Sequence, residues 1–302
     1  MKFMFPLSLN VIVEKRKIMK RITLIFTMML AVLTAYPQKL TPGKVEYRTM
    51  TSRILNEERE YGIYLPKSYW TDTLKSYPVL YLLHGKDGSD HNWADKANLA
   101  SVANQLINSK EACEMIIVCP EAGKTFMNYF NSPDWRYEDY FFEELVPYID
   151  SHYRVKADRQ HRAIAGLSMG GGGSVVYASH HPEKFCAAYS MSGYLRRQDL
   201  LSKGHENDPV IEKLQTLVED NNCIKYFQSA SPQKVEELKT VNWFIDCGDD
   251  DFTYETNADF IMTLRNAGIP YEYRVRDGGH TWEYWHSALY IALPFISDIF
   301  RQ

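Results

Sequence analysis

The five cysteines of this sequence are few and are not arranged to bind a metal. None of them falls at a Cys/His spacing typical of a zinc site. Their odd number leaves at least one thiol unpaired, and a Cys113–Cys223 disulfide has no support in the sequence. The other three lie in apolar runs, where a thiol acts as a small hydrophobic side chain. These are Cys119, Cys186 and Cys247.

Internal repeats, low-complexity tracts and an excess of basic charge are also missing. The 302 residues carry a net charge of −4. Residues 1–35 hold six basic residues and one acidic residue, so the remainder has a net charge of −9. A chain this acidic is not expected to bind nucleic acid or an anionic membrane surface. Its length and its hydrophobic content of 45% fit a globular protein of one large domain or two small ones.

Residues 1–35 show the order of features found in a secretory signal peptide. Lys20 and Arg21 precede the apolar run 22–33, and residues 34–35 are small enough for a cleavage site. The run is shorter than a membrane span, and no cysteine follows it for lipid attachment. We therefore expect export to the periplasm or beyond, with no stable membrane anchor after cleavage.

The mature chain is expected to be a single domain over residues 36–302. A well-formed signal peptide begins at Met19, so residues 1–18 are interpreted as lying upstream of the true start. The sequence does not indicate an oligomeric state.

Strand-like and helix-like segments alternate from residue 77 to the end. This alternation predicts an α/β fold with a mostly parallel central sheet and helices on both faces. Residues 44–53 and 59–65 predict antiparallel strands at the N-terminal edge. The more polar stretch near 193–240 is interpreted as a helical insertion. The strands expected in the parallel part are 77–83, 114–119, 161–166, 185–192, 241–246 and 271–276.

A glycine-rich stretch follows the strand that ends near Gly166. The pattern Gly166-x-Ser168-x-Gly170 matches the G-x-S-x-G nucleophile elbow, in which a serine sits on a sharp turn between strand and helix. The alternative is a glycine-rich phosphate loop. A P-loop would need a lysine at its end, and a dinucleotide site would need an acidic residue after the next strand. Neither residue is present, so the pattern favours Ser168 as a nucleophile.

A serine nucleophile needs a base, and His280 is the best placed histidine. It directly follows the last strand, in Gly278-Gly279-His280, at the sheet edge where ligands bind in parallel sheets. Four other histidines follow Ser168, but they fall on helices or in the polar insertion. These are His180, His181, His205 and His286.

The orienting acid is expected after the preceding strand, in the turn Gly248-Asp249-Asp250-Asp251. Asp246 lies within the strand and is too early. Asp251 is the preferred residue, with Asp250 and then Asp249 as alternatives. The two that are not the acid would bind substrate hydroxyls or cap the following turn.

The oxyanion hole requires two backbone N–H groups. One is expected from Met169, directly after the nucleophile. The other is expected from Lys86, in the loop after the strand 77–83.

Six segments of the sequence resemble the esterase D-like, or "putative esterase", branch of the α/β-hydrolases, which includes the feruloyl and acetylxylan esterases of carbohydrate esterase family one. In that branch the acid is the last residue of a Gly-x-x-Asp turn, here Asp251, and the residue after His-Gly gives an oxyanion donor, here Lys86. The resemblance implies ester hydrolysis through an acyl-enzyme without metal or cofactor. The matching segments are 64–66, 82–85, 148–154, 165–171, 247–252 and 278–282.

Aromatic residues are expected to line the site, because their faces suit sugar rings or a hydroxycinnamoyl group. Ordinary core packing is the competing interpretation. The candidates are Tyr129, Phe130, Trp135, Trp282 and Trp285. An exported enzyme of this kind would meet acylated plant polysaccharide fragments.

Other functions remain open at this point. A siderophore or generic short-chain esterase and an acyltransferase acting on a sugar would use the same residues. A non-catalytic binding protein on a hydrolase scaffold is disfavoured, since Ser168, Asp251 and His280 are all present.

Overall fold

The computed structural model describes residues 42–123, 129–196 and 208–302, together with Glu14, Met19 and Lys20. By its internal contacts the chain divides into residues 1–41 and 42–302, and the second unit is described below. The predicted signal peptide falls, apart from three residues, outside the described part. Within the described part, no helix is both long and apolar enough to cross a membrane.

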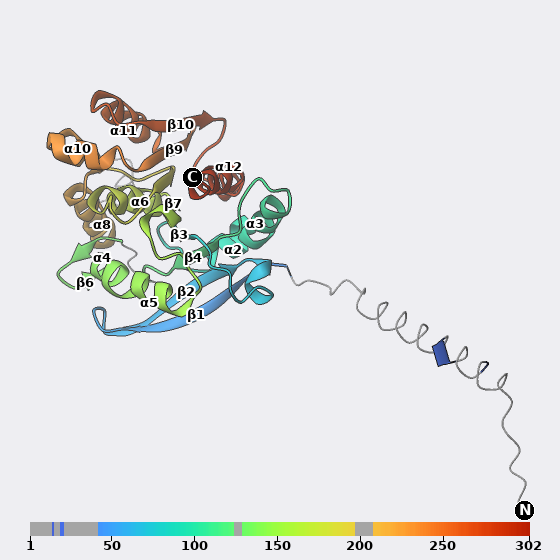
Figure 1. Ribbon diagram of the computed structural model, residues 1–302. Helices are drawn as coiled ribbons and strands as arrows, with labels where there is room; N and C mark the ends of the chain where they lie inside the picture. Colours follow the sequence, from blue (N-terminus) through green and yellow to red (C-terminus); the bar gives the residue numbers. More distant parts are fainter. Residues whose placement is uncertain (1–13, 15–18, 21–41, 124–128, 197–207) are drawn as a thin grey trace, which may run out of the picture. The chain divides into compact units, whose positions relative to one another are not determined.

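An eight-stranded sheet forms the centre of this unit (Figure 1), in the order β1-β2-β4-β3-β7-β8-β9-β10. The pairs β1·β2 and β2·β4 are antiparallel, and the other neighbouring pairs are parallel. The predicted mostly parallel sheet with antiparallel N-terminal edge strands is confirmed. The strands are β1 (Lys44–Ser52), β2 (Glu57–Leu65), β3 (Val79–Leu83), β4 (Ile116–Pro120), β7 (Arg162–Leu167), β8 (Ala187–Met191), β9 (Asn242–Gly248) and β10 (Tyr271–Arg276).

Helices cover both faces of the sheet, as expected where central strands such as β3 are apolar at every position. In β3, Val79, Tyr81 and Leu83 enter one hydrophobic core, and Leu80 and Leu82 enter the other. The first core is closed by α5 (Val146–His152), α6 (Met169–His180), α8 (Pro209–Asp220), α9 (Cys223–Gln228) and α11 (Tyr254–Asn266). The second is closed by α2 (Asn92–Ala97), α3 (Leu99–Asn108) and α12 (Trp282–Phe300).

From Pro209 on, the predicted insertion is mainly helical, with α8, α9 and α10 (Pro232–Leu238) between β8 and β9. Residues 197–207 lie outside the described part. All five cysteines are free thiols, four of them buried.

Two helices differ from the pattern that the sequence predicts. The helical spacing of apolar residues predicts a single helix over residues 93–110, but the structure divides it into α2 and α3 at Asn98, whose φ of 51° is left-handed. The apolar face of residues 137–152 predicts one helix there, and the structure has a π-helical segment within it, Tyr140–Leu145. A small hairpin of β5 (Asn131–Ser132) and β6 (Trp135–Arg136), not expected from the sequence, precedes it.

The last two parallel strands lead into loops that touch through their backbones. A Cβ atom added at Gly248, at the end of β9, would lie 2.0 Å from the carbonyl oxygen of Gly278, which follows β10. The loops that carry Asp251 and His280 can therefore pack together only if residue 248 has no side chain.

Replacing Gly248 by alanine is expected to destabilise the protein by about 2 kcal/mol or more, because backbone atoms cannot move aside as a flexible side chain can. Gly279→Ala is a matched control in the same loop, since the nearest atom to its added Cβ is 3.7 Å away. Urea unfolding of both variants checks this. Equal free energies of unfolding for the two variants would contradict it.

Candidate active site

Ser168 occupies the turn between β7 and α6, with φ 54° and ψ −117°. The two glycines of the motif make this turn possible. A Cβ at Gly166 would lie 2.3 Å from the Gly170 carbonyl oxygen, and a Cβ at Gly170 would lie 2.5 Å from that of His84. The turn is therefore a sharp strand-to-helix elbow, with the Ser168 backbone held in a sparsely populated conformation.

His280 lies between Ser168 and Asp251 and is hydrogen-bonded to both. Its Nδ1 is 2.9 Å from each carboxylate oxygen of Asp251, and its Nε2 is 2.8 Å from Ser168 Oγ. A carboxylate can only accept, so Nδ1–H donates and the neutral ring presents Nε2 as an acceptor for the serine hydroxyl. The structure thus brings together the three residues that the sequence nominated as nucleophile, base and acid.

Asp251 is 4% exposed and is held as a carboxylate by several donors. The N–H and hydroxyl of Thr253 both donate to Oδ1 at 2.8 Å. Burial by itself would raise the pKa of Asp251, but the hydrogen bond and charge of His280, with the Thr253 N–H and the Ser192 hydroxyl, bring this pKa below its ordinary value. The acid is therefore ionised and fixed in orientation.

The competing aspartates lie elsewhere. Asp246 is buried within β9, where it accepts hydrogen bonds from the Tyr189 and Tyr284 hydroxyls at 2.7 and 2.5 Å. Asp249 and Asp250, on the turn after β9, are exposed, and Asp249 accepts the Gly278 N–H at 3.1 Å. Neither is bonded to His280 among the described residues.

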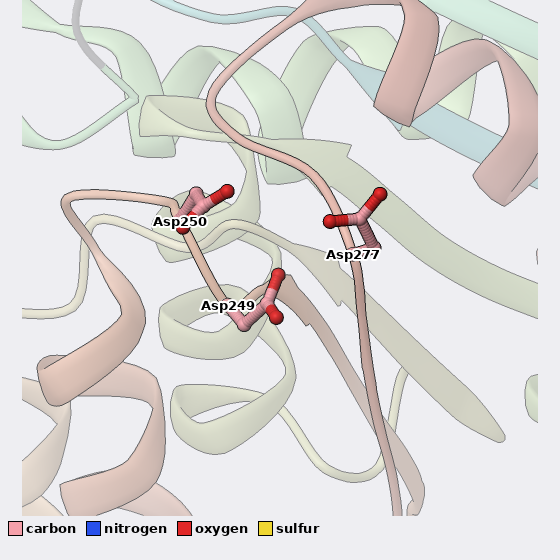
Figure 2. A group of neighbouring side chains, drawn as sticks. All are labelled: Asp249, Asp250 and Asp277. Carbon is pink, nitrogen blue, oxygen red and sulfur yellow. The ribbon is translucent and has the colours of Figure 1, made fainter.

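Asp249 and Asp250 lie beside Asp277, which follows β10 (Figure 2). The three carboxylates have oxygen atoms within 4.8 Å of one another, and all three side chains are exposed. Exposed acidic side chains of this kind do not by themselves define a metal site, and none is assigned here. The observed contact of Asp249 is with the backbone of the loop that carries His280.

The two predicted oxyanion donors face the same space as the serine. Lys86 and Met169 both line the cleft that contains Ser168. Among the described residues, neither backbone N–H donates a hydrogen bond. Both groups therefore remain able to bind a developing oxyanion.

His84 fixes the loop that carries Lys86. The imidazole is buried, accepts the Ala122 N–H at Nε2 (3.1 Å) and donates from Nδ1 to the Gly85 carbonyl at 2.8 Å. Burial lowers the pKa of His84 to about 4, so the ring is neutral in this tautomer near pH 7.

A cleft of about 430 Å³ opens above Ser168. Trp282 and Trp285, at the start of α12, form an aromatic wall with ring centroids 5.3 Å apart. The ammonium group of Lys96, on α2, lies 5.4 Å from the centre of the Trp282 ring. The lining residues are Gly85, Lys86, Asp87, Asn92, Lys96, Leu167, Ser168, Met169, Tyr194, Leu214, Phe252, His280, Trp282 and Trp285.

Three of the aromatic residues expected in the site lie elsewhere. Tyr129 is fully buried and donates its hydroxyl to the His84 carbonyl at 3.0 Å, so it supports the oxyanion loop from behind. Phe130 is buried in the core. Trp135 lines a separate hollow, where the Arg59 guanidinium lies 5.1 Å from its ring centre. For these residues the competing interpretation, ordinary packing, describes the structure.

Several cleft residues were not found from the sequence. Asn92 and Lys96 come from α2, the first helix after the oxyanion loop, and Leu214 comes from α8 of the insertion. The position of α2 at the binding edge of the sheet could have indicated the first two. No pattern in the sequence indicates which insertion residue reaches the cleft.

The sheet order, the elbow and the serine, histidine and aspartate at one sheet edge define an α/β-hydrolase. The chain matches the "Putative esterase" family over residues 52–296 and belongs to that family. It is a carboxylic-ester hydrolase.

Three similar proteins are named as esterases. A solved structure of a ferulic acid esterase is 47% identical, with a TM-score of 0.81, and the match covers 86% of this chain and 99% of that one. The acetyl esterase of Caldicellulosiruptor saccharolyticus is 25% identical over 73% of this chain and 84% of its own length. The endo-1,4-beta-xylanase/feruloyl esterase of Xylanibacter ruminicola is 25% identical over 84% of this chain, which spans only 31% of that protein.

Protonation of His84 is expected to destabilise the fold. Its pKa is about 4 in the protein against an ordinary value of 6.5, so the unfolded chain binds this proton more readily. Above pH 6.5 the ring is neutral in the folded and the unfolded chain, so His84 does not lower the free energy of unfolding. As the pH falls from 6.5 to 4, this free energy decreases by about 3 kcal/mol because of this residue. The variant His84→Asn cannot take up the proton, so its unfolding free energy should fall less between pH 6.5 and 4. Urea unfolding at both pH values measures the difference, and an unchanged pH dependence would contradict the assignment.

Proposed function

We propose that this enzyme hydrolyses feruloyl or acetyl esters on fragments of plant xylan, through an acyl-enzyme on Ser168. The observation that carries the proposal is the continuous hydrogen-bonded series from Ser168 Oγ through His280 to Asp251, opening into an aromatic cleft. The 47% identical ferulic acid esterase, matched over almost its whole length, supports the substrate class.

The geometry supports a two-step reaction. Ser168 Oγ attacks the ester carbonyl carbon while His280 Nε2 takes the hydroxyl proton, and the backbone N–H groups of Met169 and Lys86 receive the oxyanion. His280 then protonates the leaving alcohol. A water molecule, deprotonated by the same nitrogen, attacks the acyl-enzyme. His280 then returns that proton to Ser168 Oγ, which leaves as the acid is released. Asp251 holds the imidazole in the required tautomer and stabilises the imidazolium.

The walls of the cleft suit an aromatic acyl group or a sugar. Trp282 and Phe252 offer aromatic faces in this cleft, and Lys86, Lys96 and Asn92, which also line it, offer hydrogen-bond donors. This combination of aromatic faces and hydrogen-bond donors fits a substrate with both a flat apolar part and hydroxyl groups.

Export places the enzyme where such fragments are found. The support is the arrangement of basic, apolar and small residues in 1–35. Expression of the full chain, followed by N-terminal sequencing of the mature protein, tests this directly. A mature protein that retains Phe26 would contradict it.

Substitution of Asp251 and of its neighbour Asp250 should show which carboxylate orients His280. Asp251→Asn is expected to lower kcat by about 10⁴-fold. The Thr253 donors hold the amide oxygen, so the amide NH₂ donates to His280 Nδ1 and favours the tautomer that is protonated at Nε2. Asp250→Asn is the matched control, since this exposed side chain does not contact His280. Steady-state hydrolysis of 4-nitrophenyl acetate measures both. A reversed ranking would assign the acid to Asp250.

Activity on a panel of esters tests the proposal itself. The panel is methyl ferulate, acetylated xylo-oligosaccharides, and 4-nitrophenyl acetate and butyrate. We expect hydrolysis of methyl ferulate or the acetylated oligosaccharides, and a loss of about 10⁶-fold in kcat for Ser168→Ala. Turnover of the 4-nitrophenyl esters alone would contradict the xylan substrates, and activity retained by Ser168→Ala would contradict the nucleophile.

A further inference from the structure

The turn that follows β8 contains a second strained residue. Ser192 has a φ of 50°, close to the 54° of Ser168. Residues other than glycine and asparagine rarely adopt a backbone conformation in this region. It is fully buried, and its N–H donates to the Asp246 carbonyl at 2.7 Å. A buried serine kept in a costly conformation, with glycine as its next neighbour, needs a physical reason.

The backbone of this turn is bonded to the nucleophile on both sides. The N–H of Ser168 donates to the Met191 carbonyl, and the N–H of Tyr194 donates to the Ser168 carbonyl, both at 2.9 Å. Ser192 therefore lies within the turn Met191–Tyr194, whose two ends are hydrogen-bonded to the backbone of Ser168. A movement of this turn would move the nucleophile.

The side chain of Ser192 connects the same turn to the acid, Asp251, and to Trp285 in the wall of the cleft. The indole N–H of Trp285 donates to Ser192 Oγ at 3.1 Å, so the hydroxyl proton is directed away from the indole. On that side the hydroxyl lies near the Asp251 carboxylate and the Cys247 thiol, and it lowers the pKa of both groups. The Trp285 ring is also edge-on to His280, with centroids 4.8 Å apart and an interplanar angle of 87°. One hydroxyl thus lies between the acid and the aromatic residue that packs on the base.

We propose that Ser192 is a positioning residue that couples Ser168, Asp251 and Trp285 through one strained turn. The inference rests on the proposed acyl-enzyme function of Ser168. The strained backbone directs the hydroxyl inward, between the carboxylate and the indole, while its neighbours hold the nucleophile. Ser192 itself touches no reacting atom.

Among the described residues, the titratable groups that interact with Asp251 are His280 and Cys247. Burial raises the pKa of the Cys247 thiol to about 12, so it stays neutral over the working range. Loss of the Ser192 hydroxyl would leave a more basic carboxylate, which stabilises the charged form of the base more strongly. The acid limb of the kcat/KM profile should therefore move to higher pH.

Three variants separate this role from a structural one. Ser192→Ala removes the hydroxyl and keeps the strain, whereas Ser192→Gly removes the hydroxyl and relieves the strain. Ser190→Ala is the matched control, because Ser190 is equally buried two residues earlier and its hydroxyl has no hydrogen-bond partner among the described residues. The measurements are kcat, KM and the pH profile with 4-nitrophenyl acetate, and the melting temperature.

Both Ser192 variants should lose kcat by about 10-fold or more, with KM within about twofold and the acid limb at higher pH. Ser192→Gly should melt no lower than Ser192→Ala, so that activity and stability do not change together. Ser190→Ala should keep the kcat and the pH profile of the wild type.

Wild-type kcat and pH profiles in both Ser192 variants would overturn the inference, and ester hydrolysis through Ser168 would still stand. Full activity in Ser192→Gly alone would also overturn it, because the hydroxyl would then be dispensable. A wild type that hydrolyses no ester would overturn the proposed function together with this inference.

Discussion

The left-handed backbone of Ser168 is the constraint on which the rest of the site depends. Backbone strain of this kind costs about 1–3 kcal/mol and persists only where the surroundings hold it. Here it is held by the absence of side chains at Gly166 and Gly170 and by the two backbone hydrogen bonds to the turn after β8. The strain places the Ser168 hydroxyl at the edge of the sheet, within hydrogen-bond distance of His280 in the loop after β10.

Two buried carboxylates near the end of β9 show how environment decides chemical role. Asp246 accepts hydrogen bonds from two tyrosine hydroxyls and ties β8 and α12 to the strand. Asp251, a few residues later, accepts from an imidazole and from Thr253. Both are buried, yet only Asp251 faces a group that becomes charged during the reaction, so only Asp251 can stabilise that charge.

The sheet and the positions of the polar loops could be predicted from the sequence. Runs such as residues 79–83 are apolar at every position, which is the pattern of a strand with a core on both faces. Parallel strands end at one edge, so Ser168, Asp251 and His280 were expected to meet there, and the structure places them within hydrogen-bond distance.

Features that depend on tertiary packing could not be predicted. The helix ends at Asn98 and becomes π-helical at Tyr140–Leu145, but the spacing of apolar residues stays helical at both places. Tyr129 and Trp135 are predicted in the cleft because aromatic faces suit the substrate, but Tyr129 turns inward to His84 and Trp135 packs against Arg59. The strain at Ser192 also has no local sequence pattern, because serine is common where φ is negative. Only the neighbouring strands and helices determine these positions.

The central claim is a covalent acyl-enzyme on Ser168, and mass spectrometry after acid quenching tests it most directly. The enzyme would be mixed with excess methyl ferulate, quenched during turnover, digested and mapped. The account predicts a feruloyl adduct on the peptide that contains Ser168, and its absence from the same peptide of Ser168→Ala. Turnover without any adduct, or an adduct on a different residue, would contradict it.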